Sequence, residues 1–292
     1  MKQLYKLIIL ITICCAAMLK ANAQQEPTYT LYRYYSSFFN PSAIGLEDKV
    51  TFQSNFRSAF LGIPDAPETQ SFYVTVPIND KINVGVNAIA DQLFIENTTS
   101  LFASISYSLQ LSASTDLIFG VQAGGSFVNI NFDRINLPTD PLFSQNISDF
   151  NPNVGVGFYL NNDKYFASLS SPRLLSTDRV DDTNGVVTSA NNELQIYLSG
   201  GYHFDLSKSV KFTPSALVRF FDSETAVDLT GTFKFIDRIE VGANYRIDEA
   251  FGGLLYFTLK DWLEIGYAYE ANSSDIDTFE DGTHEIGLTL KF

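Results

Sequence analysis

The chain has 292 residues and a formal net charge of −14, with two cysteines and two histidines. An acidic chain is repelled by the phosphate backbone of DNA and RNA, so no nucleic-acid partner is expected. Cys14 and Cys15 both lie near the N-terminus, so the remainder offers no disulfide, no thiol nucleophile and no cysteine-ligated zinc.

The first 23 residues have the pattern of a secretory signal peptide. Lys2 and Lys6 precede an apolar run over 7–19, and Ala21-Asn22-Ala23 forms an A-x-A cleavage site before Gln24. The run is too short for a membrane helix, which needs about 20 apolar residues. We therefore expect export and cleavage after residue 23.

Two consequences follow from that cleavage. A lipoprotein signal would have a small residue before its cysteine, but Ile13 precedes Cys14, so lipidation is disfavoured. Removal of the signal peptide takes away three lysines and no acid, which leaves 16 basic and 33 acidic residues and a charge of about −17.

The segment 24–46 lacks strand-like alternation and is too aromatic for a solvated tail. We expect it to form a plug-like hatch inside or beneath the following domain, or to contact a partner. Its aromatic residues are Tyr29, Tyr32, Tyr34, Tyr35, Phe38 and Phe39.

Residues 47–292 alternate between apolar and polar positions, as two-faced strands do. In Arg238–Ile247 every odd position is apolar and every even position is polar or Gly. No stretch after the signal peptide has 18 consecutive apolar residues, so helical membrane spans are excluded. About fourteen strands are expected, near 47–57, 69–77, 81–91, 98–110, 115–130, 152–161, 164–171, 192–204, 208–220, 225–235, 237–247, 250–259, 261–270 and 284–292.

A soluble β-sandwich would also alternate, but three features favour a transmembrane antiparallel up-and-down β-barrel. The strands are long, near the 9–11 residues that a tilted membrane strand needs. Their polar faces carry Gly, Ser, Asn and Gln, and 25 Phe and 15 Tyr would supply interfacial girdles. The connections alternate between tight turns, such as Asn79-Asp80, and long segments at 131–151, 172–191 and 271–283. Outer-membrane barrels have short periplasmic turns and long outer loops.

The last strand supports the same architecture. Ile286, Leu288, Leu290 and Phe292 alternate with polar or Gly positions, and the chain ends on the aromatic residue. This ending resembles the C-terminal signature that barrel-assembly machinery accepts.

The residues contain no evident catalytic set. His203 and His284 fall at separate strand ends and are better explained as interface or turn residues. The strand glycines, among them Gly120 and Gly157, precede no helix, which indicates close backbone approach and lumen space instead of a phosphate loop. We predict no cofactor and no metal, although two acidic groups in long loops could bind a divalent cation: Asp178, Asp181 and Asp182 in one, and Asp275, Asp277, Glu280 and Asp281 in the other.

Isolated charges on the predicted lumen face leave two alternatives open. They could line a polar path through the barrel, or they could pair across strands and close it. They are Arg219, Arg238, Glu240, Arg246 and Glu264.

Ordered motifs along the chain resemble a known family. Gln24-Gln25-Glu26-Pro27-Thr28-Tyr29-Thr30-Leu31-Tyr32 and Asn40-Pro41-Ser42-Ala43-Ile44-Gly45 are similar to the opening Q-Q-x-P-x-x-T-x-Y … N-P-A-x-x-G of the PorP/SprF family of the Bacteroidetes type IX secretion system. Further similar pieces follow in order: Asn55-Phe56-Arg57 to Gly62, Ala66-Pro67-Glu68-Thr69-Gln70, Asn151-Pro152-Asn153-Val154-Gly155-Val156-Gly157, Ser170-Ser171-Pro172-Arg173-Leu174-Leu175, Gly201-Tyr202, Pro214-Ser215, Tyr245-Arg246, Ile265-Gly266-Tyr267-Ala268-Tyr269 and Gly282-Thr283-His284-Glu285.

The sequence departs from the family pattern at one place. Ala59-Phe60 stands where the family usually has Gln-Trp, so an aromatic ring is kept and the indole N–H donor is lost.

The resemblance implies a non-enzymatic outer-membrane component of the secretion apparatus. Such a protein would contact outer-membrane lipids and the periplasmic ring and lipoprotein parts, and would assist secretion or surface anchoring of large adhesins or other cargo. The alternatives are an outer-membrane channel for small or hydrophobic solutes with the N-terminal segment as hatch, and an outer-membrane hydrolase, for which no clear residue set exists.

Residues expected to contact a partner or the plug come from the resembling motifs, although turn geometry also explains each Pro and Gly among them. They are Asn40, Pro41, Gly45, Arg57, Gly62, Pro67, Thr69, Gln70, Asn151, Pro152, Pro172 and Arg173.

Overall fold

The structure is a computed structural model that describes residues 28–134, 146–175, 178–183, 186–191, 194–221, 225–273 and 281–292. The expected signal peptide, residues 24–27 and most of the two acidic loop groups lie outside the described residues or have side chains that are not described. No described helix is long and apolar enough to cross a membrane.

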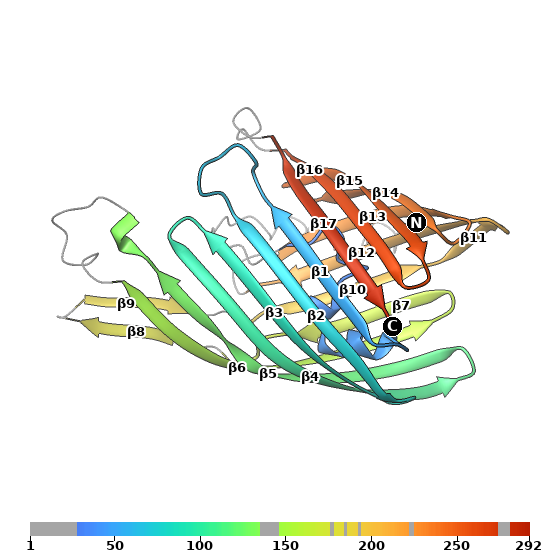
Figure 1. The fold of residues 1–292 in the computed structure, drawn as a ribbon, viewed down its shortest axis with the longest axis horizontal. Coiled ribbons are helices and arrows are strands. Elements are labelled where there is room, and N and C mark those ends of the chain that lie inside the picture. The colour runs from blue at the N-terminus through green and yellow to red at the C-terminus, as the bar shows by residue number, and fades with distance from the viewer. Residues whose placement is uncertain are drawn as a thin grey trace, which may run out of the picture.

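The chain forms a closed antiparallel barrel (Figure 1). Fifteen strands make one sheet, and β10 and β11 both pair with β12 and so share one position, which gives the fourteen expected positions. Pairing of β1 with β17 and of β10 with both β7 and β12 leaves no break in the strand order. The strands are β1 Thr51–Ser58, β2 Glu68–Asn79, β3 Ile82–Leu93, β4 Glu96–Ser112, β5 Thr115–Ile130, β6 Ile147–Asn162, β7 Tyr165–Ser171, β10 Ile196–Tyr202, β11 Phe204–Ser207, β12 Val210–Phe220, β13 Thr225–Phe235, β14 Ile239–Arg246, β15 Ala250–Lys260, β16 Leu263–Asn272 and β17 Thr283–Lys291.

The polarity of the two faces of the barrel wall is the reverse of that in a soluble protein: polar side chains are buried and apolar side chains are exposed. On β2, Ser71, Tyr73 and Thr75 are buried, whereas Phe72 and Val74 are exposed. The same parity places Ser, Thr, Asn and Gln inside and Leu, Ile, Val and Phe outside on the other strands. An apolar outer face around a polar interior is stable only when lipid surrounds the barrel.

Connection lengths separate the two rims as expected. Residues 80–81, 113–114 and 163–164 form tight turns on one rim, and the longest connections, 131–146 and 172–195, lie on the other. Because short turns are periplasmic in outer-membrane barrels, we assign the tight-turn rim to the periplasm and the other to the outside.

The structure changes two details of the expected strands. The connection 172–195 contains a hairpin, β8 Asp178–Thr183 with β9 Val186–Asn191, that pairs with no barrel strand (Figure 1). β6 begins at Ile147, five residues before the expected 152, because Ile147–Asn151 continue the ladder with β5. The polar Ser-Asp-Phe-Asn stretch had the composition of a loop, so alternation alone could not find it.

The segment before β1 is inside the barrel. It consists of a turn at 30–34 and two short 3₁₀ helices, η1 Ser36–Phe38 and η2 Pro41–Leu46. Residues of η2 contact β3, β4, β5 and β6. We call residues 28–46 the plug; they confirm the expectation of a non-strand segment within the barrel.

Lipid exposure gives a testable consequence for Val121, which is exposed on the outer face of β5 about midway between the rims. Val121→Arg should destabilise the folded barrel by about 2–4 kcal/mol, because a charge there must be buried in hydrocarbon. Leu111→Arg, at the tight-turn rim, should cost about 0–1 kcal/mol. Urea unfolding in phospholipid vesicles measures both, and equal costs would contradict the assigned membrane position.

Candidate functional site: the plug and the ionic belt of the lumen

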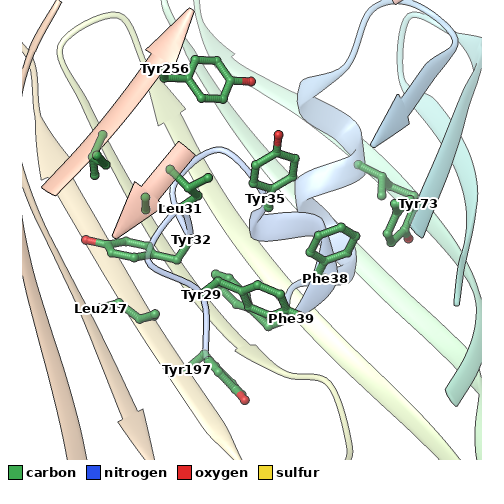
Figure 2. Close-up of a cluster of buried hydrophobic side chains, with 13 residues drawn as sticks. Tyr29, Leu31, Tyr32, Tyr35, Phe38, Phe39, Tyr73, Tyr197, Leu217 and Tyr256 are labelled. Carbon is green, nitrogen blue, oxygen red and sulfur yellow. The ribbon is translucent and has the colours of Figure 1, made fainter. Parts of the chain in front are cut away.

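Aromatic side chains of the plug form the main core of the molecule (Figure 2). Tyr32, Tyr35 and Phe38 point outward from the plug turns against side chains from several strands of the wall. The wall contributes Tyr73, Tyr197, Leu217, Leu254 and Tyr256. A polar lumen thus acquires an apolar centre only because the plug is present.

The carboxylate of Glu285 on β17 holds the start of the plug. It is fully buried and accepts hydrogen bonds from the backbone N–H groups of Thr30 at 2.7 Å and Leu31 at 3.3 Å. It also accepts from Asn55 Nδ2 at 2.7 Å and from Arg57 Nη1 at 3.3 Å. Four donors compensate the desolvation of this charge, and two of them belong to the plug backbone.

Arg57 begins a chain of ion pairs across the inner wall, which we call the ionic belt. Its Nη2 lies 2.5 Å from Glu270, and Glu270 also pairs with Arg246 Nη2 at 3.2 Å. Arg246 continues to Asp228 at 2.9 Å, and Asp228 to Arg219 at 2.8 Å. With Glu285, three buried acids offset three buried arginines, and Glu249, whose side chain is 37% exposed, lies 3.7 Å from Arg246. Buried pairs like these add little net stability but strongly penalise the loss of one partner.

A second attachment lies nearer the periplasmic rim. Arg33 Nη2 is bonded to both Glu240 on β14 and the Tyr34 hydroxyl. The Tyr34 ring stacks on Tyr256 with centroids 3.9 Å apart, and its carbonyl accepts from Gln53 Nε2 at 3.1 Å. Burial raises the pKa of Tyr34 to about 12, despite the opposing effect of Arg33.

Strand glycines make room for the plug. A Cβ on Gly120 would overlap the backbone of Pro41 and Ser42, and one on Gly157 would overlap the Asn40 amide. A Cβ on Gly287 would overlap the Tyr35 ring. The expectation that Gly120 and Gly157 allow close backbone approach is confirmed.

Asn40 and Pro41 shape the plug itself. Asn40 is the N-cap of η2, because its Oδ1 accepts from Ser42 N at 3.0 Å and Ser42 Oγ at 2.6 Å, and Pro41 follows at the first helical position. Asn40 Nδ2 also donates to the Phe158 carbonyl at 3.4 Å. Gly45, at the end of η2, leaves no space for a Cβ against Ile118. Turn geometry and wall contact therefore coincide at these three residues.

The remaining expected residues lie in separate places. Gly62, with φ +95°, and Pro67, whose carbonyl accepts from Ala59 N at 2.9 Å, shape the β1–β2 loop. Thr69 faces inward and bonds Asp91 at 2.5 Å, whereas Gln70 faces outward. The structure thus brings Asn40, Pro41, Gly45 and Arg57 to the plug, and it does not gather all twelve at one site.

Pro172 and Arg173 line a cavity on the outer side of the plug. The Pro172 carbonyl accepts from Gln122 Nε2 at 2.9 Å, and Arg173 Nη2 donates to Ser100 Oγ at 3.3 Å. Plug and wall residues complete the lining: Tyr29, Phe38, Phe39, Asn87, Ile89, Phe102, Gln195 and Tyr197.

Among the described residues, Asn151-Pro152-Asn153 has no strand partner on the β7 side of β6, because β7 pairs only with Val156–Asn161. The backbone N–H and C=O groups of residues 150, 152 and 154 point toward this edge of β6, because alternate residues of a strand bond to opposite sides. The hydrogen bond from Leu174 N to Val154 O shows this orientation. The N–H groups of Phe150 and Val154 are each capped by the preceding side chain, Asp149 or Asn153, at 2.9 Å, and Pro152 has none. Leu174 and Leu175 bond to Val154 and to the Asn153 side chain at this edge, and the capped N–H groups of the motif offer no donor to an added strand.

The structure resolves the alternatives for the isolated lumen charges. Arg219, Glu240, Arg246 and Glu264 face inward and are paired, so pairing across the wall prevails over an open polar path. Arg238 instead lies exposed at the periplasmic rim beside Asp261. Glu270 and Asp228 were not singled out from the sequence, and Glu285 only as the last residue of a motif that resembles the family, although each stands on the polar face of an alternating strand. Among the described residues no group of His, Cys, Asp or Glu is arranged to hold a metal.

The contact at Gly120 predicts that Gly120→Ala displaces the plug, because the plug backbone cannot move aside as a flexible side chain would. Single-channel recordings in planar bilayers should show conductance that the unmodified protein lacks. Gly253→Ala is the control, since its Cβ would meet only a carbonyl oxygen at 3.8 Å. Silent Gly120→Ala channels would contradict the inferred packing.

Glu285→Ala should destabilise the barrel by about 3–5 kcal/mol, because it leaves Arg57 without one acid and removes the acceptor of two plug N–H groups. Glu68→Ala, at an exposed end of β2, should change stability by less than about 0.5 kcal/mol. Urea-unfolding curves of the two variants provide the comparison. A loss below about 1 kcal/mol for Glu285→Ala would be inconsistent with an anchoring role.

Alkaline pH should release the plug. Burial raises the pKa of Tyr34 to about 12 and also raises the pKa values of Tyr29, Tyr32 and Tyr35 above 10. Because a raised folded-state pKa stabilises the protonated form, docking should be at full strength below about pH 10 and be lost as pH rises through about 12. Absorbance at 295 nm follows phenolate formation, and titration of every tyrosine near pH 10 would contradict the buried plug.

Comparison with known proteins identifies the family. The model of the family described as type IX secretion system membrane protein PorP/SprF matches residues 21–290. No curated protein matches this chain. Among solved structures, a CymD monoaromatic hydrocarbon channel aligns with TM-score 0.52 and 10% identity, covering 88% of this chain and 92% of that one. A FadL homologue from Pseudomonas aeruginosa aligns with TM-score 0.48 and 12% identity, covering 88% and 94%.

At 10% identity, the likeness to the CymD channel shows the barrel fold alone. The family match extends over the plug, the barrel strands up to Leu290 near the end of β17, and the motifs from Asn40 to Glu285. The chain belongs to the PorP/SprF family of type IX secretion system membrane proteins.

Proposed function

We propose that this protein is a non-enzymatic outer-membrane component of the type IX secretion system, which assists secretion or surface anchoring of large adhesins or other cargo. The family match over residues 21–290 carries the proposal. Its partners would be periplasmic ring and lipoprotein components at the tight-turn rim, the cargo at the outer rim, and the surrounding lipids. Residues 1–23 would be removed on export, and N-terminal sequencing of the mature protein should then begin at Gln24.

The plugged lumen supports a scaffold more than a pore. The plug is attached at two heights, through Glu285 and through Glu240, and its aromatic residues fill the space between them. A barrel closed in this way can hold partners on both sides of the membrane without leaking solutes.

Deletion of the gene tests this function. Surface display of one or more secreted proteins should be lost, while uptake of a small antibiotic across the outer membrane stays unchanged. Complementation with Glu68→Ala should restore display. Normal display in the deletion strain would refute the proposal.

The cavity on the outer side of the plug supports a second candidate, a channel for small or hydrophobic solutes with the plug as hatch. The aligned hydrocarbon channel shares the fold, and the cavity is lined by aromatic rings beside amide side chains. Solute uptake by vesicles containing the unmodified protein would favour the channel, and uptake only after plug displacement would favour the scaffold.

A further inference from the structure

Two lysines face each other near the periplasmic mouth of the lumen. Lys211 on β12 and Lys234 on β13 are direct register partners. Both lie on the inward face of their strands, which is defined by the buried Thr213 and Thr232. Like charges directly opposite one another destabilise a strand pair, so a nearby negative charge would stabilise this pair of lysines.

The barrel wall has an acidic residue beside Lys234, but that residue is bonded to the plug. Glu240 on β14 is the register partner of Lys234 on the other side. Its Oε1 is instead bonded to Arg33 of the plug and to Thr232 Oγ1, the latter at 2.6 Å. Within the part of the chain that the structure describes, Lys234 forms no hydrogen bond and no ion pair, although it is only partly exposed.

The other acids nearby do not neutralise the pair. Asp237 lies 3.2 Å from Lys211, and Asp205 on β11 is the register partner of Lys211. The Asp237 side chain is 71% exposed and Asp205 is exposed too, so water screens both interactions. Glu264 is bonded to Tyr256 at 3.0 Å and pairs with Lys291 at 3.6 Å. Lys234 is therefore left beside Lys211 without a bonded acid, because Glu240 is bonded to Arg33.

We propose that Lys211 and Lys234 form a binding site for a phosphate group at the periplasmic mouth, and that docking of the plug creates it. Two ammonium groups on adjacent strands can donate to separate oxygens of one tetrahedral anion. The phosphate can come from free inorganic phosphate or from a phospholipid headgroup, which has the same chemistry. Plug and anion are then coupled: Arg33 frees Lys234 by holding Glu240, and the bound anion favours the state in which Arg33 is docked.

Calorimetric titration of the full chain in detergent with inorganic phosphate tests the site. Lys234→Gln and Lys211→Gln should each weaken binding about tenfold, the usual effect of removing one charged donor. Lys260→Gln is the matched control, because Lys260 is an exposed cation at the end of β15 on the same rim, and it should leave affinity unchanged. Wild-type affinity in Lys234→Gln, or no binding by the unmodified protein, would overturn the proposal.

A double substitution tests the coupling. Arg33→Gln should weaken phosphate binding, because Glu240 becomes free to pair with Lys234. Adding Glu240→Gln should restore it to within about threefold, since Lys234 is again unpaired. Failure of the double variant to recover would contradict the role assigned to the plug.

Native mass spectrometry distinguishes the phosphate sources. If a headgroup occupies the site, phosphatidylglycerol should be retained by the unmodified protein, lost in Lys234→Gln, and should block the phosphate titration. If free phosphate is the ligand, phosphatidylglycerol should have no effect on that titration. Either result supports the site, and lipid retention unchanged by Lys234→Gln together with no phosphate binding refutes it.

Discussion

The buried carboxylate of Glu285 is the interaction on which the interior depends. A fully buried carboxylate must have its charge compensated, and here Arg57, Asn55 and two backbone N–H groups of the plug do so. The plug therefore completes a solvation shell that the barrel wall leaves unfinished. The ionic belt extends from the same carboxylate, so plug position and wall geometry are tied together.

The rest of the plug follows from that attachment. Thr30 and Leu31 are held by Glu285, and the plug residues after them pack against parts of the barrel wall where glycines leave space. The chain then passes from the outer half of the lumen to Glu47 at the periplasmic rim, where Asn83 binds the carbonyls of Ile44 and Glu47 at 2.7 Å. The polar barrel wall, the aromatic plug and the spaces at the wall glycines are complementary in shape and in hydrogen bonding.

Period-two alternation and connection length sufficed to predict the barrel, its fourteen strand positions and the long-loop rim. Both are local properties that a lipid environment imposes on every strand. The aromatic content of 24–46 likewise predicted a plug-like segment, but left open whether it lies inside or beneath the barrel or contacts a partner. The hydrogen-bond partners of Glu285 and Glu240 could not be predicted from the sequence. Asn55 is 230 residues from Glu285 and Arg33 is 207 residues from Glu240, and alternation sets only the face of the strand on which a residue lies. The role of Asn151-Pro152-Asn153 also required the register, since only the pairing shows that β7 leaves this edge of β6 open.

Cross-linking in native outer membranes tests the central claim that the plug occupies the lumen. Ser37 Oγ on the plug donates to Gln53 Oε1 on β1 at 2.6 Å. A Ser37→Cys, Gln53→Cys variant treated with a short thiol cross-linker should join the two residues efficiently, and its cysteines should resist bulky maleimides added outside the cell. Absence of the cross-link together with rapid labelling of residue 37 would show that the plug lies outside the barrel and would contradict this account.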